Sequence, residues 1–179
     1  MTNRFATLSR GLIVASVLMT ALFAGTAAKA DAPQFKRGQI VNFASKQQPG
    51  SIVIVTRERA LYYILGDGKA VKYKVATAKR GFEWAGSNTI SAKVKWPDWR
   101  PPAQMRKRRP DLPAFMAGGP ENPLGARAIY LGSTIYRIHG TNEPGSIGKA
   151  ASSGCIRMLN ADVSELFQHV KMGARVTVV

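Results

Sequence analysis

One cysteine and one histidine are the residues of this chain whose types and spacing could do chemistry. Cys155 is the only cysteine and lies in the segment ASSGCIRMLN, and His139 precedes it by sixteen residues, at the end of the run IYRIH. A thiol attacks as a thiolate, and a nearby imidazole can take its proton. The intervening segment is rich in Gly, Ser and other small residues, so a loop can bring the two side chains together. The pattern indicates a Cys–His nucleophilic site, and a small buried cysteine beside a structural histidine is the alternative.

The residues just before the cysteine add a second component to this site. In Ser153-Gly154-Cys155 the glycine tolerates backbone angles that other residues avoid, so the segment can form a tight turn. Successive N–H groups of such a turn can point at one spot and stabilise the oxyanion of a tetrahedral intermediate. We therefore expect Ser153, Gly154 and Cys155 to supply a candidate oxyanion hole next to the nucleophile.

Two other kinds of site fit the sequence less well. A zinc site uses ligands at paired spacings, and one cysteine with two histidines at unrelated positions lacks that pattern. Papain-like endopeptidases place the cysteine before the histidine, whereas the order here is reversed. The second histidine, His169, lies near the C-terminal end of a predicted helix, where a cation suits the helix dipole, and is interpreted as structural.

The first thirty residues have the three parts of a secretory signal peptide. A basic start precedes an uncharged run at residues 11–28, and Ala28-Lys29-Ala30 places small residues at the two positions that a signal peptidase reads. We expect cleavage after Ala30 and export of the protein. An uncleaved membrane anchor is the alternative, because the run is just long enough to span a bilayer. No cysteine lies near residue 30, which excludes a lipid-modified N-terminal cysteine.

The rest of the chain, residues 31–179, has the size of one domain that can bury a core. The full sequence has 26 Lys and Arg against 10 Asp and Glu, and residues 1–30 contribute three of the basic residues and none of the acids. Such a basic surface attracts anionic polymers, and export makes nucleic acid the least suitable of these; the alternative is that the charge only solubilises the surface. A lone thiol in an exported protein is either buried, paired with another molecule or chemically employed.

The pattern of the chain predicts a mostly β domain with one helix. After a polar lead-in at residues 31–50, the stretch SIVIVTRERALYYILGDGKAVKYKVATA indicates three strands with a turn at 66–68, and Lys72 and Lys74 mark a solvent-facing side. Two more strands are predicted within residues 126–141 and one within 174–179. The helix is expected within LNADVSELFQHVKMGA, with Asn160 as N-cap, residues 163, 166, 167 and 170 on the buried face, and Gly173 as its end.

Residues 79–122 are predicted to be irregular. They contain all three tryptophans and most of the prolines, which excludes a long helix. Long loops in compact domains are usually functional, so the basic run at 106–109 indicates a lid, with a merely solvated loop as the alternative.

The segment IHGTNEPGSIGKAASSGCIRMLNADV closely resembles the signature of the YkuD-type L,D-transpeptidases, the ErfK/YbiS-like cell-wall enzymes. The shared pattern includes His-Gly-Thr, Ser-Ile-Gly and Ser-x-Gly-Cys-Ile-Arg-Met-x-Asn-x-Asp-Val. The stretches GGPENPLGARAIYL and RALYYILGDGKAVKYKVATAKRG also resemble parts of that family. The predicted organisation is therefore a signal peptide at 1–30, a lead-in at 31–50 and an L,D-transpeptidase catalytic domain at 51–179.

The resemblance implies a β-sandwich-like fold with a short C-terminal helix, and a periplasmic enzyme of cell-wall biogenesis and cell shape that acts on peptidoglycan stem peptides. Cys155 would attack the diaminopimelate carbonyl of a tetrapeptide stem, assisted by His139, and D-alanine would leave a thioester. A second stem peptide, an envelope-protein lysine or water would accept the acyl group. No metal or organic cofactor is implied, and carbapenems are expected to acylate the thiol.

The resemblance also assigns residues around the nucleophile. Arg157 matches the arginine of the motif and would either pair with a substrate carboxylate or brace the loop. Gly140, Thr141 and Asn142 are expected at the substrate site. The sequence departs from the family where many members have a second histidine, since Ser153 stands there, and FEWAGSNTI replaces a common Thr-Pro-x-Gly turn. A Cys–His wall peptidase and a non-catalytic wall-binding protein are the alternative functions.

Overall fold

The computed structural model describes residues 1–2 and 34–179, and residues 34–179 belong to one compact unit. The predicted signal peptide and its cleavage site fall almost wholly outside the described residues. In the part of the chain that is described, no helix has both the length and the apolar character needed to cross a membrane.

The compact unit is mostly β, as the sequence predicts. Nine strands follow one another in the order β1-β4-β3-β2-β11-β6-β7-β8-β10, and β5 pairs with β9 beside them. The strands are β1 (Gln39–Asn42), β2 (Ile52–Val55), β3 (Ala60–Gly66), β4 (Lys69–Lys74), β5 (Thr77–Ala78), β6 (Gly86–Lys95), β7 (Arg127–Leu131), β8 (Arg137–His139), β9 (Ala150–Ser152), β10 (Ile156–Arg157) and β11 (Arg175–Val178). Two α-helices, α1 (Ala103–Arg108) and α2 (Asn160–His169), and two short 3₁₀ turns, Thr56–Glu58 and Pro144–Ser146, complete the described elements.

The largest core cluster joins strands from both halves of this strand order. It takes alternate residues of β2 and β3, such as Ile54 and Leu61, and packs them with Ile129 of β7, Ile138 of β8 and Leu166 of α2. Successive residues of a strand point to opposite faces of the sheet. The side chains that lie between these core residues in β2 and β3 therefore form a second, smaller cluster on the other face. β2 and β3 are therefore buried on both faces, and the first core fixes β8 and β10 relative to α2.

The meander β2-β3-β4 matches the prediction from the sequence. Its strands pair antiparallel, and the turn at 66–68 has three consecutive residues with positive φ. Val71 and Tyr73 are buried while Lys74 is exposed, in agreement with the predicted alternation. These strands are locally determined because β-branched and aromatic residues are dense in them and the turn sequence is Gly-Asp-Gly.

The predicted lead-in contributes to the sheet. β1 lies within residues 31–50 and pairs antiparallel with β4, so the sheet extends beyond the predicted start of the domain. The preceding segment packs on α2, where the Glu165 carboxylate accepts hydrogen bonds from the backbone N–H groups of Lys36, Arg37 and Gly38. Arg37 adds an ion pair with Asp162 and Phe35 packs against the core, so the segment binds through side chains as well as through its backbone.

β6 is a ten-residue strand in a region predicted to be irregular. Its first half pairs with β11 and its second half with β7, so it links the two parts of the sheet. Ile90 is its only buried residue, and most of the others are small, polar or charged. A strand with so few apolar residues is specified by its partners, which lie far away in the sequence.

Helix α2 confirms the predicted helix but corrects its ends. Asn160 is the first helical residue, and it was wrongly expected as the N-cap, because Leu159 holds the cap position and no side chain caps the helix. The helix ends at His169, before the predicted Gly173, and Val170 is already extended. Val163 and Leu166 are fully buried on the predicted face.

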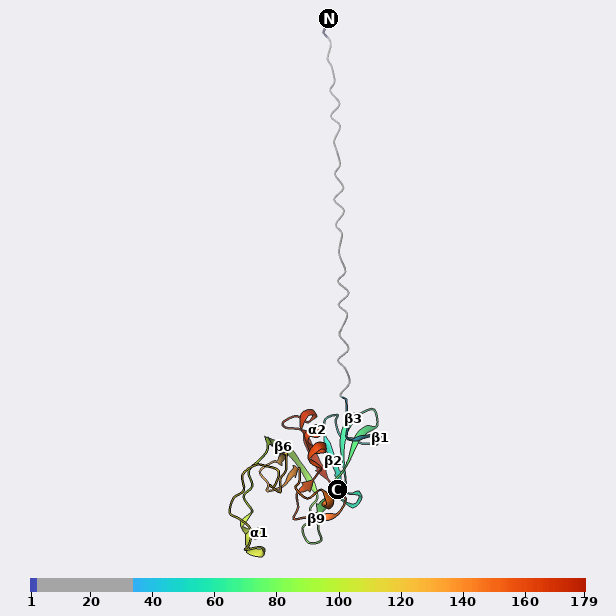
Figure 1. Ribbon diagram of the computed structural model, residues 1–179. Coiled ribbons are helices and arrows are strands. Elements are labelled where there is room, and N and C mark those ends of the chain that lie inside the picture. Colours follow the sequence, from blue (N-terminus) through green and yellow to red (C-terminus); the bar gives the residue numbers. More distant parts are fainter. Residues whose placement is uncertain (3–33) are drawn as a thin grey trace. The chain divides into compact units, whose positions relative to one another are not determined.

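Residues 96–122 form a long excursion that contains only the six-residue helix α1. Figure 1 shows this segment, with α1 near its tip, projecting from the strands. Trp99 and Met116 pair in an isolated bridge across its stem, and the Asn122 amide donates to the carbonyl oxygens of Pro97 and Ala117. Asn122 is 1% exposed, so the excursion is closed at its base by a buried polar contact.

Candidate active site

The parallel pairing of β8 with β10 brings the two predicted reactive residues together. Ile156 lies opposite Ile138 and Arg157 lies opposite His139, and both isoleucines are buried in the core. Because side chains alternate along a strand, Arg157 and His139 lie on the other face of these strands. Cys155 immediately precedes β10, and the Met158 N–H donates to the His139 carbonyl oxygen at 2.8 Å, which fixes the register.

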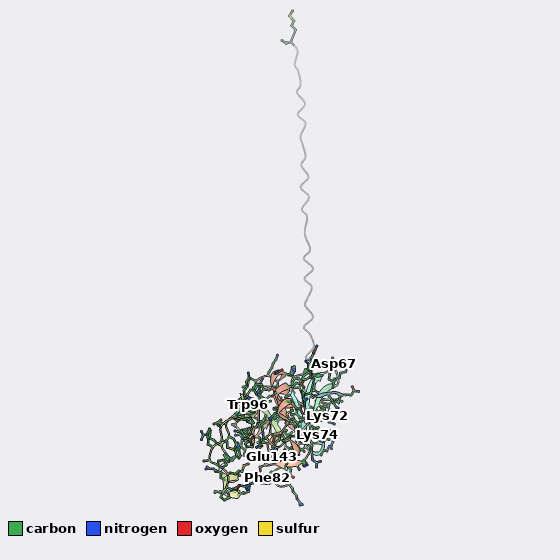
Figure 2. All side chains as sticks on the ribbon, viewed as in Figure 1. Asp67, Lys72, Lys74, Phe82, Trp96 and Glu143 are labelled. Carbon is green, nitrogen blue, oxygen red and sulfur yellow. The ribbon has the colours of Figure 1, made fainter. Side chains whose placement is uncertain are left out.

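A cavity of about 730 Å³ opens on this face. Cys155, His139, Ser153 and Arg157 all line it, as do residues of the excursion around α1. Figure 2 labels Phe82 and Glu143, which also line the cavity and lie at the same end of the compact unit. Five cationic side chains and two carboxylates line the cavity: Lys79, Arg108, Arg109, Arg137, Arg157, Glu121 and Glu143. Its charge favours an anionic ligand.

His139 is held as a neutral base. It is 4% exposed, and its Nδ1 lies 2.7 Å from the Gly140 carbonyl oxygen. A carbonyl accepts hydrogen bonds only, so Nδ1 carries the proton and Nε2 is left with its lone pair. Burial lowers the pKa of His139 to about 3, and the positive charge of Arg157 acts in the same direction.

The thiol of Cys155 is also neutral at rest. Burial raises its pKa, and a hydrogen bond from the Arg137 backbone together with the positive charges of Arg137 and Arg157 opposes that effect without overcoming it. The Cys155 Sγ lies 3.9 Å from the Ile135 carbonyl oxygen. The site therefore holds a thiol and an imidazole, both uncharged, rather than a preformed ion pair, and proton transfer must accompany attack.

The turn that carries the thiol is tied by Ser152. Its Oγ accepts the Gly154 N–H at 3.1 Å and donates to the Cys155 carbonyl oxygen at 2.6 Å. The predicted oxyanion hole is thereby corrected in one respect, because the Gly154 N–H is already engaged. In the described part of the chain the N–H groups of Ser153 and Cys155 have no hydrogen-bond partner, and they stay the candidate donors.

A stacked pair of aromatic rings packs against the same turn. Trp84 and Tyr136 stack with ring centroids 4.5 Å apart, and the Trp84 Nε1–H donates to the Gly154 carbonyl oxygen at 2.8 Å. Gly154 has φ +112, and a Cβ there would lie 2.4 Å from the Tyr136 ring. Only glycine fits this position, both for its backbone angle and for the close ring.

Arg157 contacts the loop rather than open solvent. Its guanidinium donates to the Glu143 carboxylate at 2.9 Å, and the Arg157 backbone pairs with Ala76 in both directions. This contact corresponds to the bracing role, one of the two that the resemblance implied. Pairing of Arg157 with a substrate carboxylate stays a prediction.

The three residues after His139 are placed differently from one another. Gly140 and Thr141 pack against Asn160, whose Oδ1 accepts the N–H groups of Ala126 and Thr141 and whose Nδ2 donates to the Thr141 carbonyl oxygen. A Cβ at Gly140 would lie 2.1 Å from Asn160 Oδ1, so the glycine makes room for this amide. Asn142 is exposed and donates to the Glu121 carbonyl oxygen at the cavity rim. Of the three, Asn142 alone lines the cavity, and the substrate role of all three stays a prediction.

Sequence reasoning missed several residues that shape this site. Trp84 and Tyr136 support the turn, Arg137 faces the thiol, and Asn160 holds the loop after the histidine. Only Arg137 carried a usable signal, since it lies two residues before His139 and a strand places such residues on the same face. The others reach the site through tertiary contacts that no local pattern indicates.

The chain is similar to known proteins in both sequence and fold. Residues 49–178 match the family model described as YkuD, L,D-transpeptidase catalytic domain. The probable L,D-transpeptidase ErfK/SrfK of Escherichia coli K12 is 39% identical over 137 residues, which are 72% of this chain and 43% of that protein. The chain thus matches less than half of that longer relative.

The solved structures that are similar to the compact unit include the following two. One, named as a probable carnitine operon oxidoreductase from Brucella melitensis, is 44% identical, with a TM-score of 0.54 over 79% of this chain and 92% of that one. The other, LD transpeptidase LdtMt1 in complex with imipenem, has a TM-score of 0.55 over 72% of this chain and 57% of that chain. At 14% identity the second likeness concerns the fold alone.

Proposed function

Because the chain belongs to the YkuD family of L,D-transpeptidase catalytic domains, we propose that it is a cysteine-dependent L,D-transpeptidase of peptidoglycan tetrapeptide stems. Support comes above all from one observation: the pairing of β8 with β10 puts His139 and Cys155 on the wall of one cavity. The basic lining of that cavity suits a stem peptide, which carries several carboxylates.

Acylation uses the neutral pair. His139 Nε2 accepts the thiol proton as Cys155 Sγ attacks the carbonyl carbon of the diaminopimelate residue, and the carbonyl oxygen becomes an oxyanion. The N–H groups of Ser153 and Cys155 donate to that oxyanion. When the tetrahedral intermediate collapses, the imidazolium returns its proton to the departing amine of D-alanine, and a thioester remains on Cys155.

Deacylation repeats these steps with an acceptor. A neutral amine gives up a proton to His139 as it attacks the thioester carbonyl, and the thiolate leaves and is reprotonated. An amine of a second stem peptide gives a crosslink, and a lysine of an envelope protein gives a protein attached to the wall. Water in the same position gives carboxypeptidase activity.

The proposed setting is the periplasm or cell envelope. The signal-peptide pattern of residues 1–30 supports export, and the excess of basic residues suits an anionic wall. The full chain, expressed in a Gram-negative host, should appear in the periplasmic fraction with Asp31 as its first residue by intact mass. A full-length product in the membrane fraction would favour the anchor.

The activity is tested by acylation with a carbapenem. We expect imipenem to give a covalent adduct on the purified protein, seen by intact-protein mass spectrometry. The adduct should be absent in Cys155→Ala and form more than about 100-fold more slowly in His139→Ala, because general base catalysis contributes about that much. Circular dichroism of each variant verifies that the fold is kept.

Tetrapeptide stems then define the reaction. Release of D-alanine with formation of a dimer or an amine adduct supports transpeptidation, whereas release with only tripeptide indicates a carboxypeptidase. A wild-type protein that forms no adduct with imipenem and releases no D-alanine, while its thiol stays inert to alkylation, would support the non-catalytic wall-binding alternative instead.

A further inference from the structure

Arg137 lies beside the nucleophile without a role in the chemistry described so far. It is two residues before His139 on β8, and the register that pairs Ile138 with Ile156 places it next to Cys155, which immediately precedes β10. Both residues lie on the cavity side, opposite the buried isoleucines. The guanidinium and the thiol thus share one wall of the cavity.

The guanidinium of Arg137 has an unused donor. In residues 34–179 its Nε is the only buried side-chain nitrogen or oxygen without a hydrogen-bond partner, and it forms no ion pair there. Its guanidinium lies over the Tyr130 ring, 5.0 Å from the ring centroid, and within hydrogen-bond reach of the Cys155 thiol. A buried N–H donor without an acceptor is costly, and native proteins rarely keep one without a reason.

The neighbouring Arg157 differs from Arg137 in having an acidic partner. It lines the same cavity on the same face, but its guanidinium is held by the Glu143 carboxylate at 2.9 Å. An arginine with an acidic partner has much of its charge compensated, whereas Arg137 keeps its full charge. An anion that forms on this wall therefore finds its strongest partner in Arg137.

We propose that Arg137 is the counter-charge of the Cys155 thiolate, supplying its positive charge and its free N–H when the thiol loses its proton. The thiolate is then the acceptor that the buried Nε lacks in the resting protein. This role explains how a partly buried thiol, next to a base that is itself hard to protonate, ionises at all. The inference takes from the proposed function only that negative charge forms on the Cys155 sulfur, as the thiol gives up its proton during attack and as the thiolate leaves in deacylation.

Other charged or titratable groups face the same space and must be compared. They are His139 on β8, Arg157 after the turn, Lys79 beyond β5, Arg108 and Arg109 on and after α1, Tyr136 before β8, and the carboxylates of Glu121 and Glu143. Arg109 is bound to Asp111, and Arg108 lies over the Phe82 ring, 4.8 Å from its centroid. Arg137 is distinguished from these by its register opposite the thiol.

The test is the pH dependence of thiol alkylation, which needs no peptidoglycan substrate. Iodoacetamide reacts with the thiolate, forming an S–C bond and releasing iodide, so its rate constant follows the ionised fraction of Cys155. Rates between pH 6 and 11.5 are measured for the wild type, Arg137→Lys, Arg137→Gln and the matched control Arg157→Gln, because burial raises the pKa of the thiol. A chain with Cys155→Ala verifies that no other group is labelled.

We expect the midpoint of the profile in Arg137→Gln to lie at least one pH unit above that of the wild type, with about tenfold slower alkylation at pH 7. Arg137→Lys keeps the charge and should shift the midpoint less, and Arg157→Gln should also shift it less. Equal midpoints in wild type and Arg137→Gln would overturn the proposal, as would a larger shift in Arg157→Gln.

Two further outcomes of the Arg137 experiment also decide the proposal. If Arg137→Gln does not fold, as judged by circular dichroism, the thiolate absorbance of Arg137→Lys near 240 nm is titrated, and a midpoint identical to the wild type overturns the proposal. An unchanged alkylation profile with a raised KM for a stem peptide also overturns it, because Arg137 would then bind a substrate carboxylate. Failure of the imipenem and stem-peptide assays with a shifted alkylation midpoint would refute the enzyme function alone.

Discussion

Replacement of Asn160 by alanine should destabilise the protein strongly, although Asn160 contacts neither reactive group. Its amide accepts the N–H groups of Ala126 and Thr141 at 3.0 and 3.1 Å and donates to the Thr141 carbonyl oxygen at 3.0 Å. Ala126 and Thr141 are both less than 9% exposed. Asn160→Ala thus leaves three backbone groups without partners in a place where water enters only with difficulty.

The magnitude follows from those three groups. A buried donor or acceptor left unsatisfied costs about 1–3 kcal/mol. Three of them, partly relieved by water in the space that the amide vacates, should lower the free energy of unfolding by about 3 kcal/mol. For a domain of this size that corresponds to a fall in Tm of roughly 6–12 °C. Because Thr141 is held next to the His139–Gly140 pair, imipenem acylation should also slow.

The assay is urea denaturation and thermal melting of Asn160→Ala beside two controls. Asn142→Ala removes an exposed asparagine that donates one hydrogen bond to the Glu121 carbonyl oxygen, and it should cost about 0.5 kcal/mol or less. Asn160→Asp keeps both acceptor contacts and loses the donor, so its stability should lie between wild type and Asn160→Ala. If Asn160→Ala melts within about 2 °C of Asn142→Ala, the assignment of stability to this amide fails.

Two further predictions concern the residues around the thiol. Because burial holds the pKa of His139 at about 3, below its ordinary 6.5, the unfolded state takes up this proton first as the pH falls, and stability decreases between pH 6.5 and 3. His139→Gln should therefore lose about 3 kcal/mol less than wild type between pH 7 and 4 in urea titrations, and parallel losses would contradict the prediction. Gly154→Ala should abolish imipenem acylation because its Cβ meets the Tyr136 ring, while Gly145→Ala, which meets nothing within 4 Å, should react normally. Normal acylation of Gly154→Ala by intact mass would show that the turn tolerates displacement.

The sequence determined those parts of the protein whose cause is local. The meander β2-β3-β4 follows from β-branched and aromatic runs around a glycine turn, and the buried face of α2 follows from helical spacing. Cys155 and His139 were identifiable because reactive side chains are few, and their setting among glycines and serines indicated a displayed turn. These features depend on residues within a few positions of each other.

The tertiary structure decided what depends on partners far away in the sequence. β6 is a strand because β7 and β11 pair with it, although its own residues are mostly polar. Asn160 suits an N-cap by local preference, yet it turns its amide to Ala126 and Thr141, because buried backbone groups there have no other partner. In the same way the Gly154 N–H, expected to face the oxyanion, is taken by Ser152 Oγ.

The site itself shows the division most clearly. The residue types that attack and accept protons can be read from the sequence, because their chemistry belongs to the side chains. Their protonation states cannot be read from the sequence. Burial and the charges of Arg137 and Arg157 determine them, and both depend on segments that only folding brings together. The sequence thus identifies the reacting groups. The pairing of β8 with β10 places the thiol, the imidazole and the two arginines on one face, where they can act on one another.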